Sequence, residues 1–136
     1  MFDNLRRRPG PKDAALRRAR VCYNHLAGDM GTRMFARLMT RGQLVLNGDA
    51  LTLTGAGDSF ARECGIDVEQ LRHDRAPLCR ECLDWNDRRS QLAGSLGPAF
   101  LSRFEELDWA KRDPKTRIVA FSRAGERAFD EVFPVD

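Results

Sequence analysis

Leu26-Ala27-Gly28-Asp29-Met30-Gly31 is the stretch that decides how this chain folds, because it returns 66 positions later as Leu92-Ala93-Gly94-Ser95-Leu96-Gly97. The residues that follow each copy also correspond. Thr54-Gly55-Ala56-Gly57-Asp58-Ser59-Phe60 comes after the first copy and Ser122-Arg123-Ala124-Gly125-Glu126-Arg127-Ala128-Phe129 after the second, now at an offset of 68. Self-similarity at a fixed period indicates that each copy is one structural unit. The sequence therefore predicts two similar units, with a slightly longer hairpin in the second.

Each unit reads as a helix, a tight glycine turn, a second helix, a two-stranded wing and a third helix. Apolar residues recur at helical spacing on both sides of the glycines, and Asn47-Gly48-Asp49 is a strong hairpin signal. This order predicts a mainly α fold of the α+β class, built from tandem winged-helix-like repeats. We expect a mobile basic arm at residues 1–13, the first repeat at 14–72 and the second at 73–136.

The expected elements follow from caps, breakers and apolar spacing. Asp13, Thr32 and Ser122 are predicted N-caps, Asp67 caps a short linking helix, and Pro98 takes a first helical position. The predicted helices are 14–26, 32–41, 55–64, 78–92, 98–107 and one opening at Ser122, and the predicted strands are 43–46, 51–54, 109–111 and 118–121.

Composition sets mild bounds on function. The chain has 136 residues and a net charge of +3, with 42% hydrophobic and 32% charged residues, which is typical of a soluble globular protein. It contains neither an apolar run long enough for a membrane span nor a secretory signal, so we expect a cytoplasmic protein with no membrane partner. Two histidines and no recognisable catalytic motif predict a protein that is not an enzyme and needs no cofactor.

Arginines form the candidate nucleic-acid surface. Arg33, Arg37 and Arg41 lie four residues apart, on the helix that would be the recognition helix of the first repeat, where they would meet phosphates or guanine edges. The matching positions of the second repeat are Ala99, Arg103 and Leu107, so the stripe is not repeated. Arg6, Arg7 and Arg8 of the arm are further phosphate-contact candidates. The alternatives are a solvated helix face and a solvated tail.

Four cysteines do not form a disulfide framework in a chain of this size. Cys79-x-x-Cys82 has the spacing of half a zinc site, but no short, regular pair of further ligands completes it. We therefore predict no metal and read Cys22 and Cys82 as small core residues. A metal or thiol sensor that uses Cys79, Cys82 and Cys22 stays open as the alternative.

The most specific stretches resemble a known family. These are Arg20-x-Cys22-Tyr23-Asn24-His25-Leu26-Ala27-Gly28, Leu53-Thr54-x-x-Gly57, and Cys82-Leu83-Asp84-Trp85-x-x-Arg88-Arg89-x-x-Leu92-Ala93-Gly94. They resemble the C-terminal half of bacterial ArsR-type transcriptional regulators, over about Leu16 to Phe133. The resemblance implies a bacterial, cytoplasmic, dimeric regulator. The winged-helix DNA-binding domain that precedes the module in such regulators has no counterpart here, and neither has the Cys-x-Cys motif of the metal-sensing branch.

The favoured function is therefore the dimerisation and effector-sensing part of an ArsR-like transcriptional regulator. Its expected partners are a second copy of the chain, a small-molecule effector that the sequence does not identify, and duplex DNA if the first repeat binds it. The alternative from a different class is the cysteine-based metal or redox sensor.

Overall fold

The computed structural model describes residues 13–84 and 88–135. The predicted arm at residues 1–13, with Arg6, Arg7 and Arg8, therefore lies outside the described residues except for Asp13. Asp13 caps the first helix as predicted, because its side chain accepts a hydrogen bond from the backbone N–H of Ala15.

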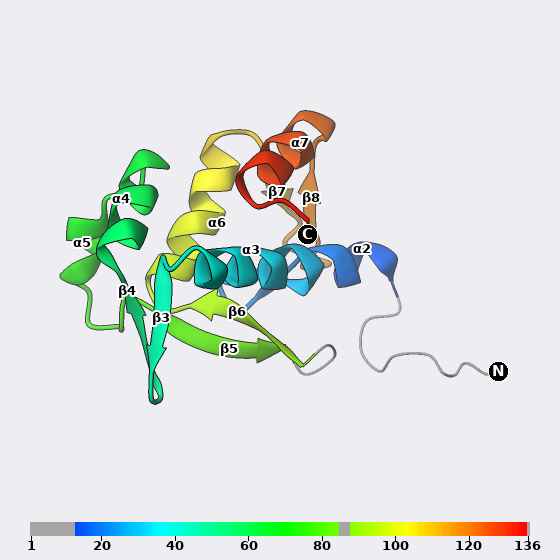
Figure 1. Ribbon diagram of the computed structural model, residues 1–136. Helices are drawn as coiled ribbons and strands as arrows, with labels where there is room; N and C mark the ends of the chain where they lie inside the picture. Colours follow the sequence, from blue (N-terminus) through cyan, green and yellow to red (C-terminus); the bar gives the residue numbers. More distant parts are fainter. Residues whose placement is uncertain (1–12, 85–87, 136) are drawn as a thin grey trace.

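Helices and two-stranded antiparallel sheets make up the described residues, and the fold is of the α+β class (Figure 1). The first half contains α2 (Ala14–Arg18), β1 (Arg20–Cys22), β2 (His25–Ala27), α3 (Gly28–Thr40), β3 (Leu44–Asn47), β4 (Ala50–Leu53) and α4 (Gly55–Glu63). After α5 (Val68–Arg72), the second contains β5 (Arg80–Asp84), β6 (Arg89–Ala93), α6 (Leu96–Glu106), β7 (Ala110–Arg112), β8 (Val119–Phe121) and α7 (Arg123–Val132). From β1 and from β5 onward, the order is the same: hairpin, helix, hairpin, helix.

The first element of each half corrects the sequence prediction. The helix expected over 14–26 ends at Arg18 and is followed by the β1–β2 hairpin, and the helix expected over 78–92 is replaced by the β5–β6 hairpin. Strands of three to five residues are too short to show a clear period in the sequence. Tertiary pairing outweighs the weak helical spacing there, since Val21 also donates its backbone N–H to Arg117, next to β8, at 2.9 Å.

The second hairpin of each half and the helix after it agree with the prediction, whereas the predicted starts of α3 and α6 do not. β3 and β4 pair from Leu44–Leu53 to Asn47–Ala50, which leaves Gly48 and Asp49 as the two-residue turn. Ser122 caps α7, and Asp67 caps α5. Thr32 is not an N-cap, because α3 already begins at Gly28, and Pro98 lies in the third position of α6 rather than the first.

Glycines explain why the Leu-Ala-Gly-x-x-Gly motif is repeated. Gly28 and Gly94 turn the chain from hairpin to helix with φ of +85° and +81°, a conformation that residues with a Cβ rarely adopt. A Cβ on Gly31 would lie 2.4 Å from the carbonyl oxygen of Leu26, and one on Gly97 would lie 2.4 Å from that of Leu92. The motif thus lets a helix begin directly against the strand that precedes it.

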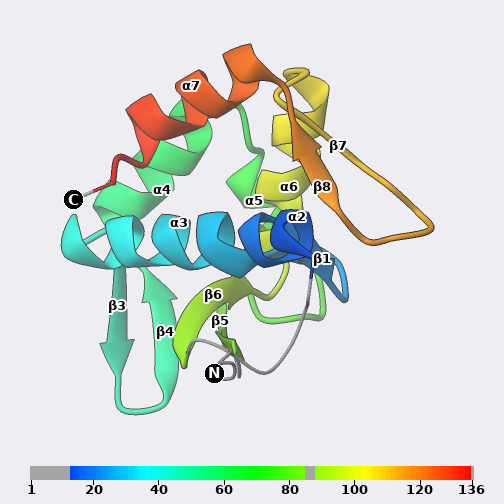
Figure 2. The same cartoon turned by 90° about the vertical axis from the view of Figure 1, so that its right-hand side faces the viewer.

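The central helix of each half packs against the first hairpin of the other half. α3 lies against β6 of the second half, α6 lies against β2 of the first, and β2 and β6 contact one another. In both views α3 crosses the middle of the molecule, with α7 on one side and the β5–β6 hairpin on the other (Figure 1, Figure 2). One core joins the halves, and its largest fully buried side chains include Leu26, Met34, Leu38, Leu92, Leu96, Phe100, Phe129 and Phe133. No helix among the described residues has the length and apolar character that crossing a bilayer requires.

Candidate functional site

Two cysteines and a histidine meet where the two hairpins contact each other. Cys22 and His25 face one another across the β1–β2 pair, and Cys82 comes from β5 of the other half. The three potential ligand atoms, the two Sγ atoms and a ring nitrogen of His25, all lie within 4.8 Å of one another. The contact between β2 and β6 brings these distant parts of the sequence together.

His25 is the most deeply buried member of this Cys22–His25–Cys82 cluster. It is only 3% exposed, and neither Nδ1 nor Nε2 has a hydrogen-bond partner. Burial lowers the pKa of His25 below its ordinary value, because the charged imidazolium loses its hydration. The imidazole is therefore neutral near neutral pH, with a free lone pair, and buried polar groups without partners are rare enough to need an explanation.

The environment of Cys22 contains opposing influences. Burial raises its pKa above the usual value for a thiol, and the neighbouring Cys82 raises it further through its charge and a hydrogen bond. The positive charges of Arg117 and Arg20 act in the opposite direction. Arg117 is held nearby, because its Nε and an Nη atom donate to the backbone carbonyl of Val21 at 3.0 and 2.7 Å.

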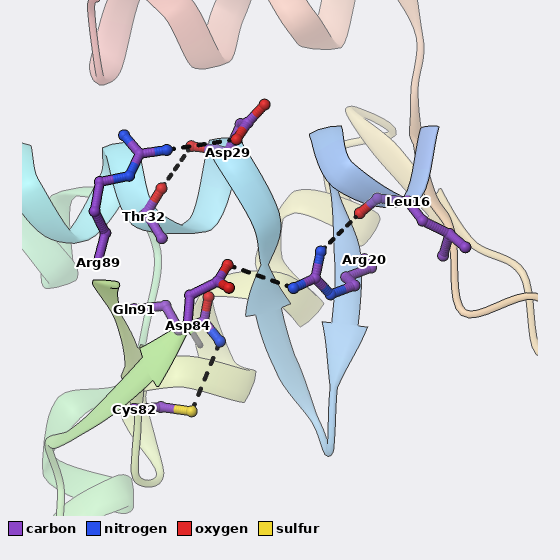
Figure 3. A network of polar contacts seen from close by, with 8 residues as sticks. All are labelled: Leu16, Arg20, Asp29, Thr32, Cys82, Asp84, Arg89 and Gln91. Carbon is purple, nitrogen blue, oxygen red and sulfur yellow. Dashed lines mark hydrogen bonds and ion pairs between the residues drawn. The ribbon is translucent and has the colours of Figure 1, made fainter. Parts of the chain in front are cut away.

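Gln91 of β6 and Asp84 of β5 lie on the same pair of strands as Cys82 and form polar contacts there (Figure 3). The amide Nε2 of Gln91 donates to Sγ of Cys82 at 3.6 Å, and Gln91 is 2% exposed. Asp84, which is also buried, accepts a hydrogen bond from an Nη atom of Arg20 at 3.4 Å. Arg20 in turn donates to the carbonyl of Leu16 at 3.0 Å. One side-chain N–H, that of Gln91, is thus directed at the cluster, and the guanidinium groups of Arg20 and Arg117 lie near Cys22.

Only two of the three cysteines that the sequence offers as metal or redox candidates lie close together. Cys22 and Cys82 meet, whereas Cys79 does not belong to the cluster that they form with His25 among the described residues. Burial raises the pKa of the Cys79 thiol to about 11. His25 does not belong to any short sequence motif of metal ligands, so only the contact between the hairpins shows that it lies beside the two cysteines. Cys22 pairs with His25 in the first hairpin, and Cys82 pairs with Gln91 in the second. Because the two hairpins differ in length, Cys22 and Cys82 do not lie at the 66-residue offset, and the sequence did not show that they occupy matching positions.

Two arginines of the predicted stripe, Arg33 and Arg41, contact the last helix. Arg33 donates to Asp130 of α7 at 2.7 Å, and its guanidinium carbon lies 5.2 Å from the centre of the Phe129 ring. Arg41 donates to the backbone carbonyl of Val132 and lies 5.7 Å from the Phe133 ring centre. These contacts hold α7 against α3. DNA binding by Arg33, Arg37 and Arg41 stays a prediction.

A basic pocket lies beside this contact. Its volume is about 430 Å³, and its lining includes Arg18, Arg33, Arg37 and Arg89, together with Asp29. Asp29 accepts a hydrogen bond from an Nη atom of Arg89 at 3.4 Å (Figure 3). Arg18 pairs with Glu126 of α7. Four arginines from α2, α3 and β6 thus line one hollow, and the guanidinium groups of Arg18, Arg33 and Arg89 are each paired with a carboxylate.

Comparison of the sequence with known proteins finds one similar curated protein. Over 113 residues the chain is 40% identical to the uncharacterized HTH-type transcriptional regulator YdfF of Bacillus subtilis (strain 168). The match covers 83% of this chain and 50% of the relative, so the chain spans about half the length of the curated protein that it matches. No protein-family model matches the chain, and no solved structure matches it.

Proposed function

We propose that this chain is the regulatory half of an ArsR-like, helix-turn-helix transcriptional regulator, a module for dimerisation and effector sensing. The observation that carries the proposal is the 40% identity to half of a protein named as an HTH-type transcriptional regulator. In this proposal the duplex-reading helix-turn-helix belongs to the other half of such a regulator, and the chain acts in the cytoplasm without catalysing a reaction.

The element order supports a duplicated unit. Each half contains a helix, a two-stranded wing and a further helix, α3-β3-β4-α4 and α6-β7-β8-α7. This central part is what we compare with a winged helix, and a hairpin takes the place of the expected first helix. Two such units in tandem form one domain, because each central helix packs on a strand of the other half.

The basic pocket supports the sensing role. A hollow of about 430 Å³ with four arginines in its lining suits a small anionic effector, such as a carboxylate or a phosphate ester. Arg33 lies in this lining and also pairs with Asp130 of α7. An anion that engaged Arg33 would compete with that pair, which gives a route from the pocket to the position of α7.

Two measurements on the same purified chain test the proposal. Sedimentation velocity over a range of concentrations is expected to show a dimer. Fluorescence anisotropy with a labelled mixed-sequence duplex is expected to show weak or no binding, even at low salt. A chain that remains monomeric at every concentration would overturn the dimerisation part.

DNA binding that is tight and falls steeply as salt rises would overturn the assignment to the regulatory half, because it would show phosphate contacts by this chain itself. A triple variant, Arg33→Ala with Arg37→Ala and Arg41→Ala, would then separate the helix from the arm. Loss of binding in this variant would assign the contacts to α3, and retained binding would assign them to Arg6, Arg7 and Arg8.

A further inference from the structure

We propose that Cys22, His25 and Cys82 bind a zinc ion at the contact between the two hairpins. The inference does not depend on the regulatory function, because it concerns three side chains and the chemistry of their ligand atoms. Two thiolates and an imidazole form a donor set that suits Zn²⁺, a borderline-soft cation with no redox chemistry of its own.

The geometry requires only a small contraction. A tetrahedral zinc ion with Zn–S bonds of about 2.3 Å holds two sulfur atoms roughly 3.8 Å apart. The three ligand atoms already lie within 4.8 Å of one another. Binding therefore requires side-chain rotations of Cys22 and Cys82, which are both half-buried, to close a remaining distance of at most about 1 Å.

His25 supplies the independent sign of a ligand. It is 97% buried, from an exposed fraction of 3%, and both of its ring nitrogens lack a hydrogen-bond partner in the protein. A buried imidazole that serves only to fill space usually donates its N–H to a carbonyl or a carboxylate. Here one ring nitrogen lies beside two sulfur atoms, and the neutral ring has a lone pair available for a metal.

Charge balance and one hydrogen bond suit the metal-bound state. Binding releases the two thiol protons to solvent, so Zn²⁺ and the two thiolates together carry no net charge. The positive charges of Arg117 and Arg20 near the Cys22 sulfur ease formation of its thiolate and repel the cation, so they favour neither state. Gln91 donates an N–H to the Cys82 sulfur at 3.6 Å, which stabilises a thiolate there and fixes its orientation.

Bound zinc would join the two halves of the chain directly. Cys22 and His25 belong to the β1–β2 hairpin and Cys82 to the β5–β6 hairpin, so the ion would link two hairpins that packing and the Arg20–Asp84 ion pair already hold together. Three protein ligands leave the fourth tetrahedral position for water or for an exchangeable ligand.

The test is titration of the reduced, chelator-treated chain with Co²⁺ as a spectroscopic substitute, followed by displacement with Zn²⁺. We expect one equivalent of Co²⁺ to produce a thiolate charge-transfer band and the intense visible bands of a tetrahedral site, and Zn²⁺ to abolish both.

Cys22→Ser and Cys82→Ser are expected to remove the thiolate band or weaken it strongly. Cys79→Ser is the matched control and is expected to retain the full signal. Gln91→Leu is expected to weaken binding about 10–100-fold, as loss of a neighbouring hydrogen bond does at other metal sites.

A second measurement on the unaltered chain keeps the proposal testable if a serine variant fails to fold. Alkylation of the thiols, followed by mass spectrometry, is expected to show that Zn²⁺ protects Cys22 and Cys82 but leaves the rate at Cys64 unchanged. Absence of both the Co²⁺ spectrum and the protection would overturn the site. A Cys22–Cys82 disulfide that forms in air without any metal binding would also overturn it and would favour a redox role.

Discussion

The two halves of the molecule place different apolar side chains at some matching positions of their shared core. Leu38 of α3 and Phe104 of α6 are 66 positions apart and are 1% and 3% exposed. Phe104 stacks on Trp109 with ring centres 5.3 Å apart and meets the edge of Phe129 at 5.6 Å. The position that matches Phe129 in the first half is Ala61, which is also fully buried. At these two positions the backbone plan and the burial recur, whereas the size and shape of the buried apolar side chain differ.

The largest expected effect is on the aromatic core of the second half. Phe104→Ala should lower the free energy of unfolding by about 3–5 kcal/mol, because the cavity leaves the Trp109 and Phe129 rings without their partner. Leu38→Ala should cost less, although it still falls in the range of about 2–5 kcal/mol for such changes. Urea unfolding followed by circular dichroism measures both, and Leu107→Ala, at a position 39% exposed, is the control. If Leu38→Ala costs as much as Phe104→Ala, the ring cluster contributes no extra stability.

The next prediction concerns a feature that the halves share. Gly31→Ala and Gly97→Ala should each destabilise the chain by about 1–3 kcal/mol, because the new methyl group meets a strand carbonyl and forces the helix away. The two costs should be similar, since each Cβ would lie 2.4 Å from the oxygen that it meets. Gly55→Ala is the matched control in α4, where a Cβ meets nothing within 4 Å. Clearly unequal costs at the two positions would show that the halves do not tolerate strain alike.

The smallest expected effect is the loss, at acidic pH, of the stability that one ion pair of the second half contributes. Arg112 donates from Nε and an Nη atom to the two carboxylate oxygens of Glu105, at 2.9 and 2.7 Å. Met39 and Leu46 occupy the matching positions of the first half. The hydrogen bonds from Arg112 hold the pKa of Glu105 below its ordinary value of 4.5. Stabilisation by this pair is therefore complete above the ordinary pKa and is lost as the pH falls through the lower, folded-state pKa.

Both side chains are partly exposed, so the pair should contribute only about 0.2–1 kcal/mol. Urea unfolding at neutral and at acidic pH should show that Glu105→Gln reduces the loss of stability on acidification. Glu63→Gln, on the exposed surface of α4 in the first half, is the control for removal of a carboxylate. An identical pH profile for Glu105→Gln and the unaltered chain would show that the ion pair does not stabilise the fold.

Prediction from the sequence worked best where a local signal fixes the backbone. The turn at Gly48 and Asp49 predicted the first wing, and Ser122 predicted the start of α7, because a tight turn and an N-cap are satisfied by neighbouring residues. It failed for the β1–β2 and β5–β6 hairpins. Their residues carry no turn signal of comparable strength, and Tyr23 adopts a φ of +58° in the first of them.

In the candidate site, too, the sequence identified residues but not the contacts between distant parts of the chain. Cys22 and Cys82 were candidates because thiols are common metal ligands, but the sequence paired Cys82 with Cys79 through their spacing. Spacing identifies ligands only when both lie on one local element. The cluster instead joins β1, β2 and β5, and its formation depends on the contact between β2 and β6.

The sequence by itself determined that one order of elements occurs twice, where the glycine-dependent junctions lie, and where the second hairpin and the last helix of each half begin. These features depend on the conformational needs of a few neighbouring residues. Only the tertiary structure decided that each central helix packs on the other half, that Arg33 and Arg41 contact α7, and that His25 joins the two cysteines. Those contacts join residues far apart in the chain, and the free energy that selects them comes from burying the shared core.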